Sequence, residues 1–199
     1  MAVRLSKALC EGRREDQYTL LGSRERPPAL ANLECEAVLS PYRHELALKT
    51  RWLPAIETQL DCDAILYPYW PSPPKRRRAA PPAVVFVHDL AFKLRPAEVP
   101  WQQRLYMGAV LGRSLRDASA VLVPSEATRR DLLATYPITG LRSRVHVVPE
   151  GVTPEVQPGP LPPRLAPGFI LAVGTIEPRK NYPRLIAAYR HLRRESVPL

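Results

Sequence analysis

Short apolar runs alternate along the chain with longer segments in which apolar residues recur at helical spacing. Continuous apolar runs of this kind are typical of strands that are buried on both faces of a parallel sheet. We predict strands at Ala64–Tyr67, Ala83–Val87, Ala120–Val123 and Val145–Val148, and weaker ones at Tyr18–Leu21 and Leu33–Leu39. Strands that alternate with helices indicate an α/β fold, so the pattern predicts a doubly wound parallel sheet.

Helices are expected between these strands and before them. Residues 1–11 carry an apolar stripe, and residues 43–60 have helical character that Pro54 must kink or divide. Ser125 is a good N-cap for a helix over residues 126–135. A further helix is expected over residues 101–116. Five residues recur in it at steps of four and three, and Gly108 and Gly112 among them suggest close packing on the sheet; the five are Trp101, Leu105, Gly108, Gly112 and Leu115.

His88 and Asp89 are the first candidates for chemistry, because they directly follow the predicted strand Ala83–Val87. In open parallel sheets, ligands bind beyond the carboxyl ends of the strands. The alternative is structural: His88 would bond a backbone carbonyl, and Asp89 would cap the next segment. A His-Asp pair also occurs in metal phosphohydrolases, but those enzymes need further ligands. The remaining histidines show no matching pattern, and they are His44, His146 and His191.

A second candidate site lies near the end of the chain. Phe169–Val173 is expected to form a buried strand of a parallel sheet, which Gly174 ends. A polar loop follows, and Asn181 is a plausible N-cap for the next helix. A glycine turn, a helix N-terminus and the adjacent cations Arg179 and Lys180 together favour a bound phosphate. The alternative is that both cations only solvate a surface loop.

The length and composition of the chain limit the number of domains and the kinds of partner that we expect. The 199 residues suffice for one full domain and part of another, and 24 prolines predict many turns and linkers. The net charge of +10 comes mostly from arginine and is spread along the chain, so we interpret it as a compositional bias. A basic run at Lys75–Arg78 could contact nucleic acid or acidic lipid, yet such runs are usually solvated loops. Nucleic acid is therefore not expected as a partner.

The cysteines and the apolar runs indicate the compartment. Cys10, Cys35 and Cys62 are widely spaced and form no C-x-x-C pair, so neither a zinc site nor a disulfide framework is predicted. No signal-peptide core is present at the N-terminus, and no apolar run has the length of a membrane span. We expect a cytoplasmic protein and leave peripheral contact with the inner face of a membrane open.

Four sequence stretches together resemble glycosyltransferase family 4. In chain order they are VVFVHDLAF (84–92), VLVPSEATRRDLL (121–133), VHVVPEGV (145–152) and FILAVGTIEPRKNYPRLIAAY (169–189). The resemblance is greatest to mannosyl- or rhamnosyltransferases that build bacterial surface polysaccharides. It implies a retaining enzyme of GT-B type that transfers a hexosyl group from a nucleotide-diphosphate sugar to a glycan or lipid-linked acceptor. It also implies two Rossmann-like domains that face each other across a cleft.

The resemblance assigns roles to particular residues. His88 matches the family's histidine near the donor sugar and the reaction centre, which makes it the catalytic candidate. The donor-binding candidates are Gly174, Thr175, Arg179 and Lys180, with Lys180 on the donor phosphates and Thr175 where many members have arginine. Glu150 lies at the hinge, where asparagine is commoner. No metal or cofactor is expected, because the GT-B resemblance does not require a metal and the nucleotide sugar is itself a substrate.

The chain also departs from the family pattern. Members normally start with a strand and a glycine-rich loop, and they carry a Glu-x7-Glu segment that is absent here. We therefore expect a fragment without detectable activity of its own. Residues 1–148 would form an incomplete acceptor-side domain, 149–167 a linker and 168–199 the start of a donor-binding domain. A non-catalytic partner of a longer glycosyltransferase stays the main alternative, and a nucleic-acid binder ranks behind it.

Overall fold

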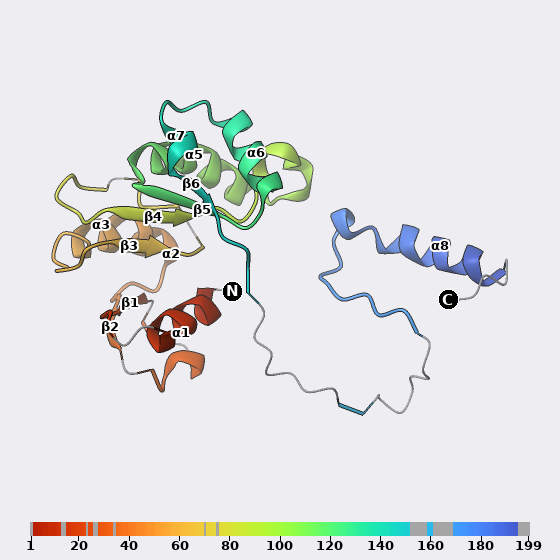
Figure 1. Cartoon of the computed structure of the whole chain (residues 1–199), viewed down its shortest axis with the longest axis horizontal. Coiled ribbons are helices and arrows are strands. Elements are labelled where there is room, and N and C mark those ends of the chain that lie inside the picture. The colour runs from red at the N-terminus through yellow and green to blue at the C-terminus, as the bar shows by residue number, and fades with distance from the viewer. Residues whose placement is uncertain are drawn as a thin grey trace.

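A four-stranded parallel sheet forms the centre of the protein in the computed structural model (Figure 1). The structure describes residues 2–12, 15–22, 24–25, 28–33, 35–69, 71–74, 76–151, 159–160 and 169–194. The strands lie in the order β3-β4-β5-β6, with bounds β3 Ile65–Tyr67, β4 Ala83–Phe86, β5 Ala120–Val123 and β6 Val145–Val147. All three pairings are parallel, which confirms the predicted α/β sheet.

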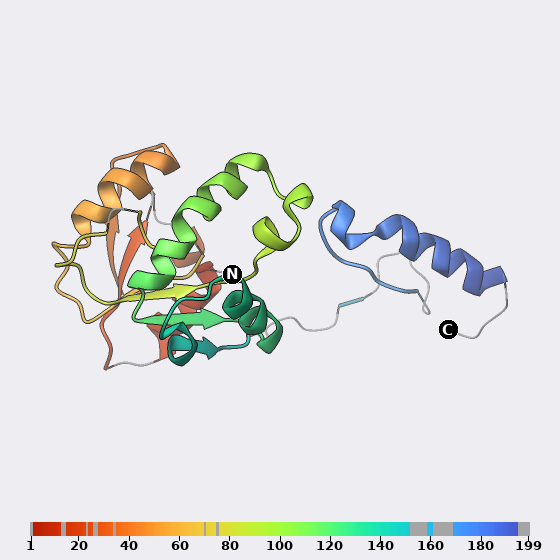
Figure 2. The same cartoon turned by 90° about the horizontal axis from the view of Figure 1, so that it is seen from above.

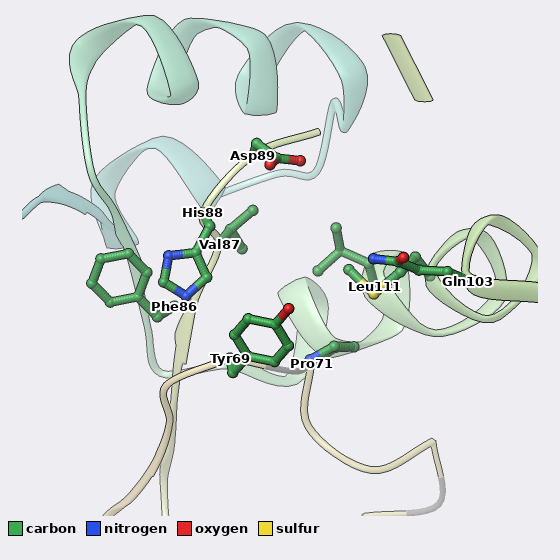
Figure 3. A pocket seen from close by; sticks show the side chains of 9 residues that line it. Tyr69, Pro71, Phe86, Val87, His88, Asp89, Gln103 and Leu111 are labelled. Atoms are coloured by element: carbon green, nitrogen blue, oxygen red, sulfur yellow. The ribbon is translucent and has the colours of Figure 1, made fainter. Parts of the chain in front are cut away.

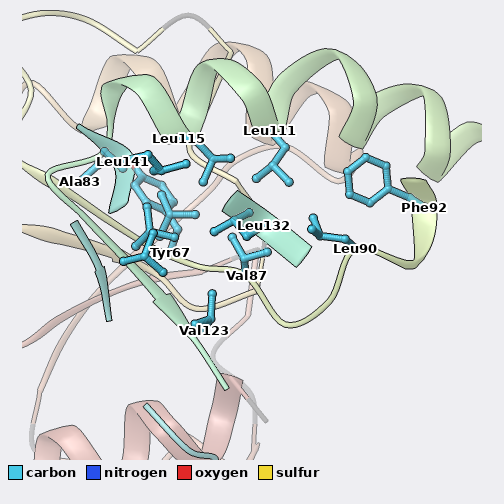
Figure 4. Close-up of a cluster of buried hydrophobic side chains, with 14 of the residues drawn as sticks. Tyr67, Ala83, Val87, Leu90, Phe92, Leu111, Leu115, Val123, Leu132 and Leu141 are labelled. Atoms are coloured by element: carbon cyan, nitrogen blue, oxygen red, sulfur yellow. The ribbon is translucent and has the colours of Figure 1, made fainter. Parts of the chain in front are cut away.

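Three helices cover one face of this sheet. They are α5 Trp101–Asp117, α6 Glu126–Thr135 and α7 Leu141–Arg144. Leu111 and Leu115 of α5, Leu132 of α6 and Leu141 of α7 are all buried against alternate strand residues (Figure 4). A fully buried leucine contributes about 1.5–3 kcal/mol through the surface it removes from water, so this layer fixes helices and sheet as one body.

The start of α6 confirms the predicted N-cap. The backbone N–H of Thr128 donates to the Ser125 hydroxyl at 3.2 Å, and Ser125 itself has an extended backbone. Such a cap satisfies one of the N–H groups that a helix leaves unpaired at its N-terminus. The helix therefore begins where the local sequence predicts.

The N-terminal part forms a smaller unit. Helix α1 (Ala2–Gly12) is followed by β1 (Thr19–Gly22) and β2 (Glu36–Leu39), and the two strands pair in parallel as a sheet separate from β3–β6. A short 3-10 helix, η1 (Pro28–Leu30), lies between them. All three larger elements were predicted, although the second strand begins at Glu36 and not at Leu33.

The helical segment around Pro54 changes its winding along its length. It consists of α2 (Glu45–Ala47), the π-helical turn η2 (Leu48–Trp52) and α3 (Leu53–Ile56). Pro54 has no N–H to donate to the preceding turn, and the wider π turn comes directly before it. Pro54 thus divides the helix as predicted, and the helix ends earlier than residue 60.

Two predictions about apolar residues are wrong. Phe169–Val173 forms no strand, and Val173 is 84% exposed. A strand needs a neighbour to bond its backbone, and no described strand pairs with this run. The close packing on the sheet that Gly108 and Gly112 suggested is not found at Gly108, because a side chain there would meet nothing within 4 Å. Gly112 does sit close to another group, but that group is the ring of Tyr136 and not the sheet.

The remaining helices are short or lie near the C-terminus. They are α4 Ala91–Leu94, η3 Pro96–Glu98, η4 Pro178–Lys180 and α8 Tyr182–Arg194. Helix α8 confirms the helix expected after Asn181, whose carbonyl accepts the N–H groups of Arg184 and Leu185. Among the described residues, no helix has both the length and the apolar character required to cross a membrane.

A buried charged cluster ties the proline-rich loop to α3 and β3. The Glu57 side chain is fully buried, accepts a hydrogen bond from the Tyr67 hydroxyl and forms an ion pair with Arg76 at 3.4 Å. Burial raises the pKa of the Glu57 carboxyl, while Tyr67 and the charge of Arg76 oppose that rise. One cation of the run 75–78 therefore serves an internal pair, whereas Arg77 and Arg78 are exposed.

We predict that Arg76→Met lowers the free energy of unfolding by about 3 kcal/mol at pH 7, because it leaves the Glu57 carboxylate buried without its cation. The folded variant then holds a proton on Glu57 more tightly than the unfolded chain, so its stability falls as pH rises. Urea unfolding at several pH values measures both effects. Arg77→Met is the matched control and should change stability by less than about 0.5 kcal/mol. Equal effects of the two substitutions would contradict the assignment.

Candidate functional site

The His88 side chain lies beside the rings of Phe86 and Tyr69 in the lining of a pocket (Figure 3). Its Nε2 is 2.7 Å from the carbonyl oxygen of Pro68, the residue directly after β3. Its Nδ1 is 3.1 Å from the Glu150 carboxylate, which lies beyond the end of β6. His88 itself follows β4, so one imidazole joins segments that are 20 and 62 residues away in sequence.

Aromatic rings hold the imidazole from the side. The Phe86 ring stacks on it at 4.5 Å between centroids, and the tilted Tyr69 ring lies at 5.8 Å. Next to His88 is a hollow of about 110 Å³, which is also lined by Gln103 and Met107 from α5. The hollow has room for a few water molecules or for one edge of a polar ligand. His88 is thus fixed in orientation at the rim of a small, partly polar hollow.

Asp89 has the structural role of a cap, which was the alternative to a role in catalysis or binding. Its carboxylate accepts the backbone N–H of Ala91 at 2.9 Å and so caps the first turn of α4. The bond from His88 to the Pro68 carbonyl likewise agrees with the structural alternative. However, that bond occupies only Nε2, while the Nδ1 side opens toward an exposed carboxylate. The structure therefore fits a His88 that is held at one nitrogen and presented at the other.

The two acceptors set the hydrogen-bonding options of the ring. A neutral imidazole carries one N–H and can donate to only one of them, whereas an imidazolium can donate to both. The bond to Pro68 is the shorter of the two and is partly buried, and the contact with Glu150 is exposed. The proton of the neutral ring is therefore expected on Nε2.

The predicted donor loop is the second part of the candidate site. A Cβ on Gly174 would lie 2.8 Å from the Tyr182 hydroxyl and 3.8 Å from Cε of Lys180, so the loop folds back onto the start of α8. Thr175, the residue after Gly174, is exposed. Lys180 is also exposed, at the end of η4. Arg179 belongs to η4, and its side chain lies outside the described part of the chain.

The backbone of this loop offers less to a phosphate than the sequence suggested. The N–H groups of Lys180 and Asn181 donate to the carbonyls of Glu177 and Pro178. Asn181 adopts a left-handed conformation with φ of 49°, and Pro183 in the first turn of α8 has no N–H. The interaction with an anion would therefore rest mainly on the charge of Lys180.

The structure brings the predicted site residues together in two groups. His88 and Glu150 meet at the sheet edge, and Gly174 and Lys180 meet at the start of α8. That both groups face one cleft stays a prediction. In the described ranges, no three His, Cys, Asp or Glu side chains lie close enough to hold a metal ion.

Sequence reasoning missed several residues of this site. Pro68 and Tyr69 directly follow a predicted strand, so the rule that ligands bind at carboxyl ends could have identified them. Gln103 carries no comparable signal, because it lies inside α5, on the turn that happens to pass the hollow. Glu150 was noted as a hinge residue without a partner.

We predict that neutral His88 carries its proton on Nε2. Long-range proton–nitrogen NMR spectra of the histidine rings report this directly. The exposed His146, for which the structure shows no ring contact, is the reference and should populate both tautomers. A neutral His88 with its proton on Nδ1 would contradict the geometry, because Glu150 and not Pro68 would then hold the ring.

No curated protein matches the chain. The sequence model of Glycosyltransferase Family 4 matches residues 1–156, which is more than half of the chain and includes both His88 and Glu150. The protein belongs to glycosyltransferase family 4.

Proposed function

We propose that the protein takes part in the transfer of a hexosyl group from a nucleotide-diphosphate sugar to a glycan or lipid-linked acceptor. The observation that carries the proposal is the placement of His88, which is held at the carboxyl ends of the parallel strands through Nε2 and presented at Nδ1. Family membership supports sugar transfer in general. The retaining GT-B mechanism, a mannosyl or rhamnosyl donor and a role in polysaccharide synthesis in the cytoplasm are the finer parts of the proposal.

In the proposed reaction, the bond between the anomeric carbon of the donor sugar and its diphosphate breaks. That carbon forms a new bond to the acceptor oxygen, and the proton of the acceptor hydroxyl passes to the departing diphosphate. His88 would contact the donor sugar through its Nδ1 side, with the Glu150 carboxylate beside it. Glu150 is exposed and can yield its place to a sugar hydroxyl at little cost.

The departing diphosphate gains negative charge as the bond breaks, so fixed cations stabilise the transition state. Lys180 is the best placed described cation of the donor loop, and Gly174 and Thr175 would let the phosphates approach the backbone. Arg179 would add a second charge. The proposed division is an acceptor-side unit in residues 1–148, a linker in 149–167 and donor binding in 168–199.

Turnover by this chain alone is expected to be undetectable. Electrostatic stabilisation requires charges that are held in place before the reaction. Phe169–Val173 pairs with no strand of the described residues, so no sheet in that part of the chain holds the loop that carries Lys180. The same exposed apolar run favours a second candidate function, in which the chain is a non-catalytic partner of a longer glycosyltransferase. Copurification with such an enzyme would support that second candidate.

We predict that Lys180→Ala weakens donor binding roughly tenfold, which is typical for the loss of one charged contact to phosphate. Calorimetric titration of the whole chain with uridine, guanosine and thymidine diphosphate sugars measures the effect. Arg190→Ala is the matched control, because Arg190 is an exposed cation further along α8. Equal affinities of both variants and the wild type, or no binding of any donor at millimolar concentration, would contradict the proposed role of the loop.

A further inference from the structure

The start of α5 and the neighbouring α4 expose an unusual combination of side chains. Leu94, Trp101 and Leu105 are 54%, 64% and 67% exposed. Trp101 and Leu105 lie one helical turn apart and therefore on the same face of α5. Helices α4 and α5 contact each other, so Leu94 belongs to the same region. Figure 2 shows the lime-green start of α5 at the rim of the α/β body.

A hollow of about 480 Å³ lies in this region. Its lining combines the small residues Gly108 and Ala109 and the apolar side chains of Trp101 and Leu105 with the cations Lys93 and Arg104. The glycine leaves open space where a side chain would otherwise stand. We call this region the α4–α5 surface, and its residues are Lys93, Leu94, Trp101, Arg104, Leu105, Gly108 and Ala109.

The charges at the α4–α5 surface are mainly positive. Lys93, Arg95 and Arg104 are all exposed, and Arg104 is held near η3 by a bond from its guanidinium to the Pro96 carbonyl at 3.3 Å. Glu98 is the exposed acid of the same connection, and the nearby Asp89 is engaged with the Ala91 N–H. The local balance therefore favours an anionic partner.

We propose that the α4–α5 surface docks on an anionic lipid bilayer. Tryptophan rings favour the boundary between lipid head groups and acyl chains, and helix faces that combine apolar side chains with cations lie in that boundary. Lys93 and Arg104 would meet the lipid phosphates, while Trp101 and Leu105 would enter among the acyl chains. The apolar face is short, so binding is reversible and depends on the anionic lipid.

The α4–α5 surface is separate from the site at His88. The same helix α5 lines the small hollow beside His88 with Gln103 and Met107, which are not part of the α4–α5 surface. Docking would thus bring the His88 hollow near a membrane and the head groups of lipid-linked molecules. The inference stands without the transferase proposal, because no residue proposed for catalysis or donor binding contributes to it.

The first test is cosedimentation of the whole chain with vesicles of phosphatidylcholine alone or mixed with phosphatidylglycerol. We expect binding to the mixed vesicles only. Trp101→Ser with Leu105→Ser should lower it at least about tenfold, and so should Lys93→Glu with Arg104→Glu, because each cation near an anionic surface contributes about fivefold. Thermal unfolding verifies that each variant is folded.

Matched controls carry the same changes elsewhere. Leu185→Ser with Ile186→Ser removes an exposed apolar pair from α8, and Arg130→Glu with Arg142→Glu changes the net charge by the same amount. Both should bind like the wild type. Absence of vesicle binding, equal binding to neutral vesicles or an equal loss in the controls would overturn the proposal. A change of oligomeric state in Trp101→Ser without a loss of vesicle binding would also overturn it, since a second copy would then be the occupant.

A second test depends less on folding. Lipids that carry bromine in their acyl chains should quench the tryptophan emission of the wild type. Trp101→Phe keeps an aromatic ring and should keep most of the binding, while the quenching should largely disappear. Persistent quenching in Trp101→Phe would place a different tryptophan in the bilayer and contradict the proposal.

Discussion

The parallel direction of β3–β6 is the constraint on which the site depends. Because all four strands run the same way, their carboxyl ends gather at one edge of the sheet. His88 uses that edge: its ring bonds the carbonyl that follows β3 and faces the carboxylate that follows β6. Glu150 lies where the chain leaves the sheet, so the same ring also contacts the exit toward the donor loop. Reversing the direction of β3, β4 or β6 would separate the three groups.

The core and the candidate site occupy different parts of the sheet. Helices α5, α6 and α7 bury one face through their leucines, which fixes the sheet. The edge where the strands end carries the polar groups and the hollow beside His88. Helix α5 serves both, because Leu111 lies in the core and also lines that hollow. Movement of α5 against the sheet would therefore change the shape of the hollow beside His88.

Local patterns in the sequence predicted the parts of the fold that depend on local forces. The four central strands and the Ser125 cap fall where apolar runs and capping chemistry place them. The predicted packing of Gly108 on the sheet was wrong, because the spacing of residues along a helix does not show which face of the helix meets the sheet. The strand predicted at Phe169–Val173 was wrong because a strand also needs a partner strand, which no local pattern can show.

The candidate site was predictable to the same degree. His88 was identified by its position after a strand, but its bond to Pro68 and its contact with Glu150 join residues far apart in sequence. The pairing of Arg76 with Glu57 is similarly non-local, and it removed one cation from a run that had suggested a polyanion partner. A sequence shows which residues could take part in catalysis or binding. The contacts that those residues make depend on how the strands are arranged in the fold.

An NMR titration of the whole chain with a panel of nucleotide-diphosphate sugars shows whether the sheet edge and the donor loop bind the same ligand. We expect one donor class to shift the His88 ring resonances and the amide resonances of Thr175 and Lys180 with the same midpoint. A common midpoint means that the sheet edge and the donor loop bind one molecule. Shifts at the loop without any change at His88, or no shift at either place, would contradict the claim.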